Sequence, residues 1–281
     1  MPVGRSYPPS GRHQPDAPLL CRLKRDVVAN GLPSNRDRCM TLGPNTNASI
    51  EVLRPRCILC AGEDRDALWQ ALADAGVREV RRHSSYRCYE FWHGSDLLII
   101  WTGIGTGCLE PLLWEILRPR VIEQLILVGT AGRMPDAITE VGLVYVVDQA
   151  WLAGTGLDRE RIVTPLRPRW PNLGGHPLAS CVSTDFFYGF APRNLESPYP
   201  LNAVRLLADF DEHVRKKTGL VDMETAQFYA LCSAFAQEDC QFIAVKGASN
   251  TVGQLDEQLP NTPGVLTKSI GLARRLFAAT R

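Results

Sequence analysis

The sequence predicts an α/β protein with one domain built around a mostly parallel sheet. Apolar runs typical of buried strands alternate along the chain with segments whose apolar residues recur at helical spacing. Several of these runs end in short stretches rich in glycine and small polar residues, the place where α/β proteins bind ligands. A hydrophobic content of 45% in 281 residues is enough to build the core of such a domain.

The first half of the domain alternates strands and helices. The apolar run at 97–101 is typical of a strand buried on both faces of the sheet, whereas the two expected strands before it are more polar. We expect strands at 57–61, 80–82, 87–92, 97–101 and 124–128, and helices at 64–75 and 107–117.

The second half contains a longer irregular stretch. Residues 151–177 carry proline and tryptophan without a regular period, and apolar runs resume after them. We expect strands at 142–148, 178–183, 220–222 and 241–245, a helix that starts near Met223, and a closing helix at 267–279.

The N-terminal part of the chain differs from the rest. Residues 1–50 hold many prolines, glycines and arginines and show no sustained period. Such a segment buries too little apolar surface to fold by itself. We therefore expect residues 1–50 to be a disordered or loosely attached extension, and the domain to occupy residues 51–281.

Composition excludes several classes of partner and location. A formal net charge of +1 offers no basic excess to neutralise a nucleic acid. No stretch approaches the roughly 20 apolar residues that cross a membrane, and the N-terminus lacks the apolar region of a secretory signal. Nine cysteines, an odd count scattered through apolar segments, are typical of reduced thiols in a cytoplasmic protein.

The cysteines and histidines do not predict a metal site or a cofactor. Cys57 and Cys60 form a C-x-x-C pair inside an apolar run, whereas redox and zinc pairs normally lie on turns. Core packing is therefore the better interpretation. The five histidines show no ligand spacing.

The most informative motif is V-D-M-E-T-A at residues 221–226, where an apolar strand gives way to a helix. Such a junction presents Asp222 and Glu224 at the edge of a sheet, although acids also favour the first turn of any helix. The motif resembles the signature of the nucleoside phosphorylase and nucleosidase superfamily. That resemblance implies that Glu224 grips a ribose hydroxyl and that Met223 packs beneath the ribose.

The stretch A-G-E-D-R at residues 61–65 follows the first strand. Gly62 permits close approach of the backbone, and the following helix N-terminus attracts anions. Arg65 is a candidate for a bidentate grip on phosphate, and Glu63 or Asp64 for activating a water. The alternative is a helix cap with a solvated charge cluster.

Two further glycine-rich stretches match superfamily elements. T-G-I-G-T-G at residues 102–107 lacks the spacing of a dinucleotide site and resembles a superfamily element that turns the chain beneath the site. V-G-T-A-G at residues 128–132 resembles a superfamily loop, which implies that Thr130 touches ribose or phosphate and that Gly132 lies under the base. Leu143 stands where relatives usually have aspartate.

The base-binding candidates are Phe187 and Asn250. By resemblance, Phe187 stacks on the base, although a lone phenylalanine is more often part of a core. Relatives acting on adenine nucleosides have an aspartate at the position of Asn250. An asparagine resembles relatives that handle 6-oxopurines, among them futalosine hydrolases, since an amide donates and accepts hydrogen bonds but supplies no proton. The segment S-N-T-V-G at residues 249–253 would also make a good turn.

Taken together, the resemblance covers residues 56–280. It implies a three-layer αβα domain with a mixed, mostly parallel sheet, and a homo-oligomer. It also implies cleavage of the N-glycosidic bond of a nucleoside, more readily a purine nucleoside, with inorganic phosphate or water as co-substrate.

Hydrolysis and phosphorolysis both remain open, with a small preference for hydrolysis. Leu127 and either His83 or Arg82 occupy positions where phosphorylases have arginines, which weakens a phosphate site. Strict alignment, however, puts Arg65 at the position of the hydrolases' glutamate. A catalytically weak nucleoside- or nucleotide-binding module is a second hypothesis, and the glycine spacing disfavours a dinucleotide oxidoreductase.

Overall fold

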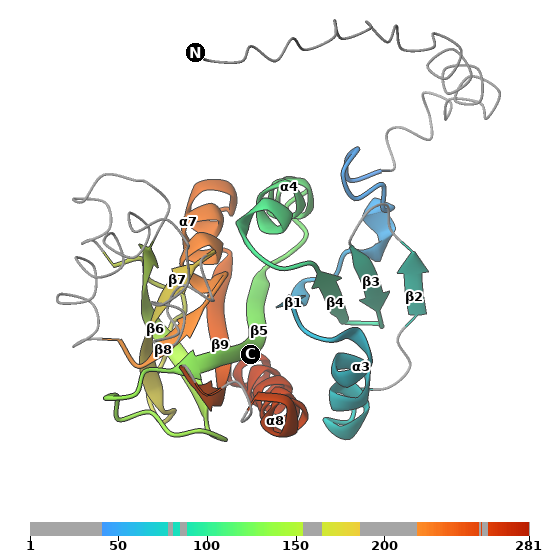
Figure 1. Cartoon of the computed structure of the whole chain (residues 1–281). Helices are drawn as coiled ribbons and strands as arrows, with labels where there is room; N and C mark the ends of the chain where they lie inside the picture. Colours follow the sequence, from blue (N-terminus) through green and yellow to red (C-terminus); the bar gives the residue numbers. More distant parts are fainter. Residues whose placement is uncertain are drawn as a thin grey trace, which may run out of the picture. The chain divides into compact units, whose positions relative to one another are not determined.

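A single sheet of nine strands organises the part of the chain that the computed structural model describes (Figure 1). This part comprises residues 41–77, 81–84, 89–153, 165–185, 218–252, 254 and 258–280. It falls within one unit that begins at Thr41. The strands are β1 (Arg56–Ala61), β2 (Arg81–Ser84), β3 (Glu90–His93), β4 (Leu97–Thr102), β5 (Gln124–Arg133), β6 (Val144–Ala153), β7 (Leu178–Thr184), β8 (Leu220–Asp222) and β9 (Gln241–Thr251).

The sheet combines parallel and antiparallel pairs. Its order is β2-β3-β4-β1-β5-β8-β7-β6-β9, and β9 also pairs with β5. The β1 pairings with β4 and β5 are parallel, as is β5 with β9, whereas β5 with β8 and β6 with β9 are antiparallel. Because β9 returns to β5, the strands β5, β8, β7, β6 and β9 form a closed ring at one end of the sheet.

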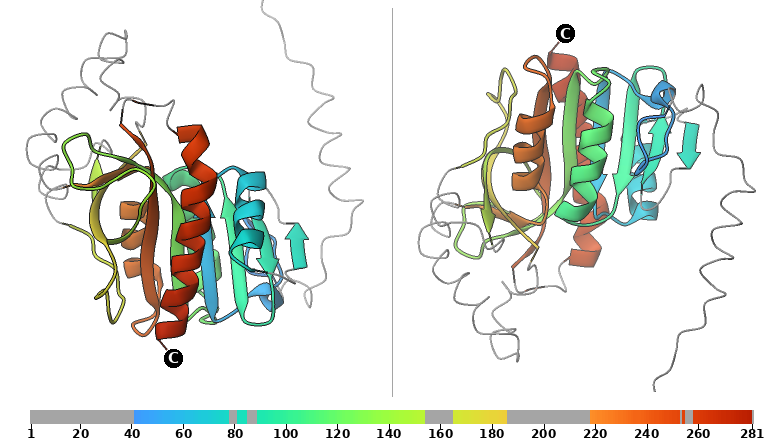
Figure 2. Two further views of the ribbon diagram at one scale, coloured as in Figure 1. Left: turned by 90° about the horizontal axis from the view of Figure 1, so that it is seen from below. Right: turned by 90° about the horizontal axis from the view of Figure 1, so that it is seen from above.

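Helices cover both faces of the sheet. The described helices are α3 (Arg65–Asp74), α4 (Thr106–Leu117), α7 (Thr225–Phe235) and α8 (Gln258–Ala279), with a short 3-10 helix at Ile50–Val52. Figure 2 shows α3 and α8 on one face and α4 and α7 on the other. None of the helices within the described ranges is long and apolar enough to cross a membrane.

Alternation along β1 separates the two cores. Cys57 and Leu59 pack in the core that includes α4 and α7, while Ile58 and Cys60 pack in the core that includes α3 and α8. Both cysteines are free and fully buried, which confirms the core-packing interpretation of the C-x-x-C pair. A period of two with apolar residues on both faces is what a strand between two helical layers requires.

The mixed α/β class predicted from the sequence is confirmed, and the differences lie at element ends. Strands β5 and β9 continue to Arg133 and Thr251, through stretches expected to be loops. Their glycines and small residues are poor strand formers, yet the two strands pair along this whole length, with a register shift between Ala131 and Gly132. Helix α8 likewise starts at Gln258 and contains Pro263, well before the expected start at residue 267.

Residues 41–50, which the composition groups with the N-terminal extension, pack against the domain. Leu42 and Ala48 are buried, and Thr41 forms a bridge with Ser49. The buried Glu115 of α4 accepts hydrogen bonds from the backbone and side chain of both Asn45 and Thr46, at 2.7–2.8 Å. This carboxylate therefore holds a segment some 70 residues away in the sequence against α4.

Candidate active site

A cavity of about 310 Å³ lies at the carboxyl ends of β1, β5, β7, β8 and β9. This size falls at the lower end of the range for small-molecule sites. The edge is also where an α/β sheet is expected to bind a ligand. The lining residues are Ala61, Gly62, Glu63, Ile104, Thr130, Ala131, Gly132, Asp185, Val221, Asp222, Met223, Glu224, Ser249 and Asn250.

Glu224 reaches across the cavity instead of capping its own helix. It occupies the N-cap position of α7, but its side chain makes no capping hydrogen bond there. Its Oε1 accepts a hydrogen bond from the backbone N–H of Gly105 at 3.1 Å, and its Oε2 lies 3.5 Å from Nζ of Lys246. Burial raises the pKa of Glu224 to about 7, although Lys246 acts in the opposite direction.

Asp222 performs the helix-capping role. Its carboxylate accepts hydrogen bonds from the backbone N–H and hydroxyl of Thr225 and from the hydroxyl of Ser183. Nζ of Lys246 lies 2.9 Å from its Oδ2. Burial alone would raise the pKa of Asp222, but Lys246 and the two hydroxyls outweigh it and hold the pKa below its ordinary value. Asp222 is therefore a fixed anion that shapes the turn carrying Glu224.

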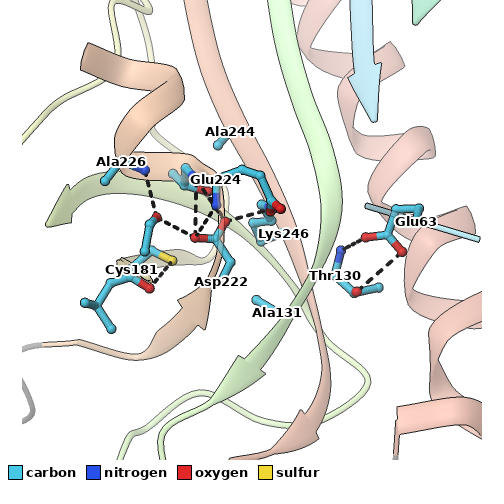
Figure 3. Close-up of polar contacts among 12 residues, drawn as sticks. Glu63, Thr130, Ala131, Cys181, Asp222, Glu224, Ala226, Ala244 and Lys246 are labelled. Carbon is cyan, nitrogen blue, oxygen red and sulfur yellow. Dashed lines mark hydrogen bonds and ion pairs between the residues drawn. The ribbon is translucent and has the colours of Figure 1, made fainter. Parts of the chain in front are cut away.

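Lys246 is the cation that joins these two acids. It lies on β9 with only 1% of its surface exposed. Burial disfavours its charge, but Asp222 and Glu224 outweigh burial and raise the pKa of Lys246. Figure 3 shows the lysine between the two carboxylates. A buried lysine is tolerated only with such partners, because an unpaired buried charge is strongly destabilising.

Glu63 forms a second polar group in the same cavity. The backbone N–H of Thr130 donates to its Oε1, and the Thr130 hydroxyl lies 3.4 Å from its Oε2 (Figure 3). Only 7% of Glu63 is exposed, and burial raises its pKa. The indole N–H of Trp101 donates to the Glu63 carbonyl at 2.7 Å and holds the loop in place.

Gly129 allows Glu63 and Lys246 to approach the same point of β5. A methyl group on Gly129 would lie 2.8 Å from Oε1 of Glu63 and 3.2 Å from Nζ of Lys246. The first distance is shorter than van der Waals contact permits. A side chain at this position would therefore displace the Glu63 carboxylate from the place that it occupies beside β5.

Asn250 and Ser249 line the cavity from the end of β9. Both are buried, and the Ser249 hydroxyl donates to Oδ1 of Asn250 at 3.0 Å. The amide Nδ2 of Asn250 donates to the carbonyl of Thr251 at 3.1 Å. These bonds fix which end of the amide is the donor, and the group is neutral.

Comparisons with known proteins place this geometry in a known fold. No protein-family model and no curated protein matches the sequence. Among solved structures, the 5′-methylthioadenosine nucleosidase of Arabidopsis thaliana matches with a TM-score of 0.58 and 12% identity, over 81% of this chain and 96% of that chain. The purine nucleoside phosphorylase of Toxoplasma gondii matches with a TM-score of 0.57 and 16% identity, over 84% and 98%. A futalosine hydrolase mutant of Helicobacter pylori matches with a TM-score of 0.55 and 12% identity, over 80% and 100%.

This chain has the nucleosidase and nucleoside phosphorylase fold. The resemblance inferred from the motifs is thereby confirmed at the level of the fold, over most of the length of each relative.

Some of the residues that the sequence predicts to form the site of this nucleosidase and phosphorylase fold do not line the cavity. Asp64 is exposed and caps α3, with its Oδ1 accepting from the N–H of Ala67 at 2.8 Å. Arg65 is half-exposed and lies 3.2 Å from Glu90. Neither residue lines the cavity. Phe187 lies outside the described residues. The sequence positions that do meet there are Gly62, Glu63, Thr130, Gly132, Met223, Glu224 and Asn250.

Leu127, at one position where phosphorylases have an arginine, is fully buried in the core, and Arg82 and His83, the candidates for another, lie on β2. Leu143, which stands where relatives usually have aspartate, is exposed. Within the described residues, no group of three or more histidine, cysteine or acidic side chains is arranged to hold a metal ion.

Sequence reasoning missed Lys246 and Asp185. Lys246 had a recognisable signal, since it directly follows the apolar run of β9 and a charge there requires a buried partner. Asp185 follows β7 in the segment from which Phe187 was chosen, but only the folded chain brings it to the cavity, next to Gly105.

Proposed function

We propose that this chain is an N-ribosyl hydrolase, which cleaves the N-glycosidic bond of a nucleoside with water as the acceptor. The observation that carries the proposal is that two buried carboxylates, Glu63 and Glu224, come from different loops to line one cavity. The solved structures of the same fold support it, because they include a nucleosidase, a nucleoside phosphorylase and a futalosine hydrolase. In this proposal the enzyme is a three-layer αβα domain that acts on purine nucleosides as a homo-oligomer.

Glu224 has the position and charge to stabilise the sugar. Breaking an N-ribosidic bond builds positive charge on the ribose, as in glycoside hydrolysis. A carboxylate that accepts a hydrogen bond from a ribose hydroxyl binds more strongly as that charge grows. Glu224 is held by Gly105 and Lys246 before any ligand enters, so it needs no rearrangement to act. Met223 beside it would pack beneath the ribose.

Glu63 is the candidate for the general base. Its carboxylate is fixed by Thr130, and burial raises its pKa. A general base works best when its pKa approaches the operating pH. A buried glutamate with a raised pKa meets this condition better than an exposed glutamate does. Asp64, the alternative base, is exposed and caps a helix.

The charge of the cavity favours water over phosphate. Four acids line it in the described part of the chain, Glu63, Asp185, Asp222 and Glu224, and no arginine does. Lys246, the nearby cation, is already paired with two of them. An anionic co-substrate would meet these acids and no arginine among the described lining residues, and Arg65, the candidate phosphate ligand, is engaged with Glu90.

The base would bind at the end of the cavity formed by β5 and β9. Gly132 and Asn250 lie there close together, with Nδ2 of Asn250 within 3.9 Å of a methyl placed on Gly132. Gly132 has no side chain to occupy the space of a base, and the Asn250 amide can donate a hydrogen bond to that base. Phe187 remains the candidate for stacking.

A nucleoside-binding module without turnover is the second candidate function. The observation that favours it is the neutral amide of Asn250, because no side chain at the β5–β9 end of the described lining can protonate a leaving base.

Base release from a substrate panel tests both candidates. The panel is inosine, guanosine, adenosine, methylthioadenosine, futalosine and uridine, each with and without inorganic phosphate, and chromatography measures base and sugar. We expect phosphate-independent release of base and free sugar. Release that requires phosphate and yields a sugar 1-phosphate would identify a phosphorylase instead. Binding of these nucleosides without release of any base would support the binding module.

Variants connect the activity to the two carboxylates. We expect Glu224→Ala and Glu63→Gln each to lower kcat/KM by about 10²–10³-fold, the usual effect of removing a transition-state contact or a general base. Glu238→Gln, at an exposed position beyond α7, is the matched control and should retain wild-type turnover. Wild-type turnover in either active-site variant would remove that residue from the mechanism.

A further inference from the structure

Two carboxylates from different loops meet the start of helix α4. Gly105 is the N-cap residue of this helix, and the first turn that follows, T-G-C-L, contains no acid. The backbone N–H of Gly105 donates to Oε1 of Glu224 at 3.1 Å. A methyl group built on Gly105 would lie 3.1 Å from Oδ1 of Asp185, so this second carboxylate packs directly against the glycine. Acids are stabilised at a helix N-terminus, where the first N–H groups have no partner within the helix.

The loop that carries Asp185 starts from a firmly held strand end. Ser183, two residues earlier on β7, donates its hydroxyl to Asp222 and accepts from the backbone N–H of Ala226 at 2.8 Å. Strands β7 and β8 also pair at this point, Ser183 with Asp222. Asp185 and the turn that carries Glu224 are therefore anchored to the same pair of strand ends, and both reach from there to the start of α4.

The hydrogen bond from Gly105 affects the charge of Glu224. Burial raises the pKa of Glu224 to about 7, and Lys246 opposes this rise. The acids Asp222 and Glu63 add to the rise, whereas the Gly105 N–H favours the carboxylate. Lys246 is shared with Asp222, which lies closer to it. Displacement of the Gly105 N–H would therefore leave Glu224 more often protonated, and a protonated carboxyl stabilises a cationic sugar less well.

We propose that Asp185 is a positioning residue, which holds the first turn of α4 at the place from which Gly105 donates to Glu224. This inference rests on the proposed role of Glu224 in cleavage and assigns Asp185 a part in the same reaction. Asp185 does not need to touch the substrate for this role, because it acts through the start of the helix. Its contact and the Gly105–Glu224 bond both join loops from the two halves of the chain, and both meet at one glycine.

Two substitutions of Asp185 separate position from charge. Asp185→Ala removes the side-chain oxygens and the negative charge. Asp185→Asn removes only the charge and keeps an oxygen that suits a helix N-terminus as well as that of aspartate does. Loss of a nearby negative charge alone would lower the pKa of Glu224 in both variants. A difference between the two variants therefore reports the position of α4.

The ionisation of Glu224 can be measured without a ligand. ¹³C NMR of protein labelled at the glutamate carboxyl carbons follows it, and the Glu224→Gln spectrum assigns the signal. We expect the midpoint in Asp185→Ala to lie about one pH unit above that in Asp185→Asn, the size expected for loss of one hydrogen bond to a charged group. Equal midpoints would overturn the inference.

Kinetics give a second readout, with the nucleoside of the panel that the wild type cleaves fastest. A rise of about one pH unit from about 7 leaves about a tenth of Glu224 ionised at neutral pH, in place of about half. We expect the neutral-pH kcat of Asp185→Ala to be about fivefold below that of Asp185→Asn, with KM nearly unchanged, because Glu224 acts mainly in the transition state. The deficit should shrink as the pH rises. An equal increase of KM in both variants would show that Asp185 binds the substrate directly through its charge, which would contradict the positioning role.

Gly105→Ala tests the same contact from the side of the helix. The added methyl would lie 3.1 Å from Oδ1 of Asp185, on a backbone with a φ of +82° that side chains rarely adopt. We expect this change to raise the Glu224 midpoint, and to raise it less in Asp185→Ala, where the contact is already lost. Equal rises in both backgrounds would show that the two residues act independently, contrary to the inference. Glu110→Ala, which removes an exposed acid from the same helix, is the control and should match wild type.

The outcomes separate this inference from the proposed function. Different Glu224 midpoints in Asp185→Ala and Asp185→Asn, with no cleavage of any nucleoside by the wild type, would support the positioning of α4 and refute the hydrolase. Equal midpoints with an active wild type would refute the role of Asp185 and leave the hydrolase intact. Circular dichroism spectra verify that each variant is folded before it is titrated.

Discussion

At the scale of single residues, two acids of one motif that share Lys246 have pKa values shifted in opposite directions. Asp222 lies 2.9 Å from the lysine and also receives two hydroxyls, so its pKa falls below the ordinary value. Glu224 lies 3.5 Å away with fewer donors, and burial raises its pKa to about 7. Of these neighbouring carboxylates, Asp222 caps α7, whereas Glu224 faces the cavity, where we propose that it contacts the ligand.

Replacement of the lysine should reveal how strongly the acids depend on it. Lys246→Met leaves Asp222 and Glu224 buried without a counter-ion, which typically costs about 3–5 kcal/mol. We expect urea denaturation to show a loss of unfolding free energy in that range. Lys268→Met, at an exposed lysine that contacts only the Gly142 carbonyl in the described residues, is the control. Similar small losses in both variants would contradict the role of Lys246.

The choice among Glu63, Asp64 and Arg65 shows where residue-level prediction ends. The sequence predicted the edge of the sheet at which all three residues lie, but not which of their side chains would point into the cavity. Direction depends on Gly62, whose φ of +73° turns the chain so that Glu63 enters the cavity and the next two residues join α3 and its surface. A single backbone angle of this kind has no signature in composition or spacing.

At the scale of elements, β5 and β9 form one side of the candidate site. Thr130 and Gly132 lie on β5, and Lys246, Ser249 and Asn250 on β9, in stretches that local propensity assigns to loops. Long-range pairing between the two strands overrides that propensity. Rigid strands hold side chains more firmly than loops do, which suits a site whose groups must be in place before the ligand arrives.

A substitution at Gly129 tests whether β5 holds the side chains of the site in place. Gly129→Ala puts a methyl 2.8 Å from Oε1 of Glu63, and we expect kcat/KM to fall at least about tenfold because small displacements of reacting groups are costly. Gly107→Ala is the matched control, since nothing lies within 4 Å of its added methyl. In helix α4 that change should raise stability by about 0.5–1 kcal/mol. Wild-type kinetics for Gly129→Ala would argue against a site built around β5.

At the scale of the whole molecule, the sequence predicted the class of fold, but it did not predict that part of the sheet closes into a ring. Alternating apolar runs and helical periods predicted the mixed α/β class and nearly every described element. The ring of β5, β8, β7, β6 and β9 could not be predicted in this way, because it depends on pairings between strands far apart in sequence. The docking of residues 41–50 was missed for a similar reason, since Glu115 supplies their partner from α4.

Glu115 should make a measurable contribution to global stability. Glu115→Gln removes the charge and turns an amide N–H₂ toward N–H donors, a change that costs about 2–3 kcal/mol when buried. Glu110→Gln, exposed on the same helix, should stay within about 0.5 kcal/mol of wild type. Chemical denaturation of the three proteins measures the difference.

The same contact predicts a dependence on pH. Hydrogen bonds from Thr46 and Asn45 outweigh burial and lower the pKa of Glu115 below its ordinary value of 4.5. A depressed pKa means that the stabilisation is complete above 4.5 and is lost as the pH falls through the folded value. The gap in unfolding free energy between wild type and Glu115→Gln should therefore shrink in acid. A gap that widens in acid would contradict this assignment.

The hydrogen bond from Trp101 to the Glu63 carbonyl also gives the molecule an optical reporter. Indole emission responds to its polar surroundings, and this indole is attached to the loop that carries the candidate base. A ligand that displaces Glu63 would change the fluorescence of Trp101, and Trp101→Phe would isolate its share among the six tryptophans. Occupancy of the cavity would then be visible in real time, whether or not a bond is broken.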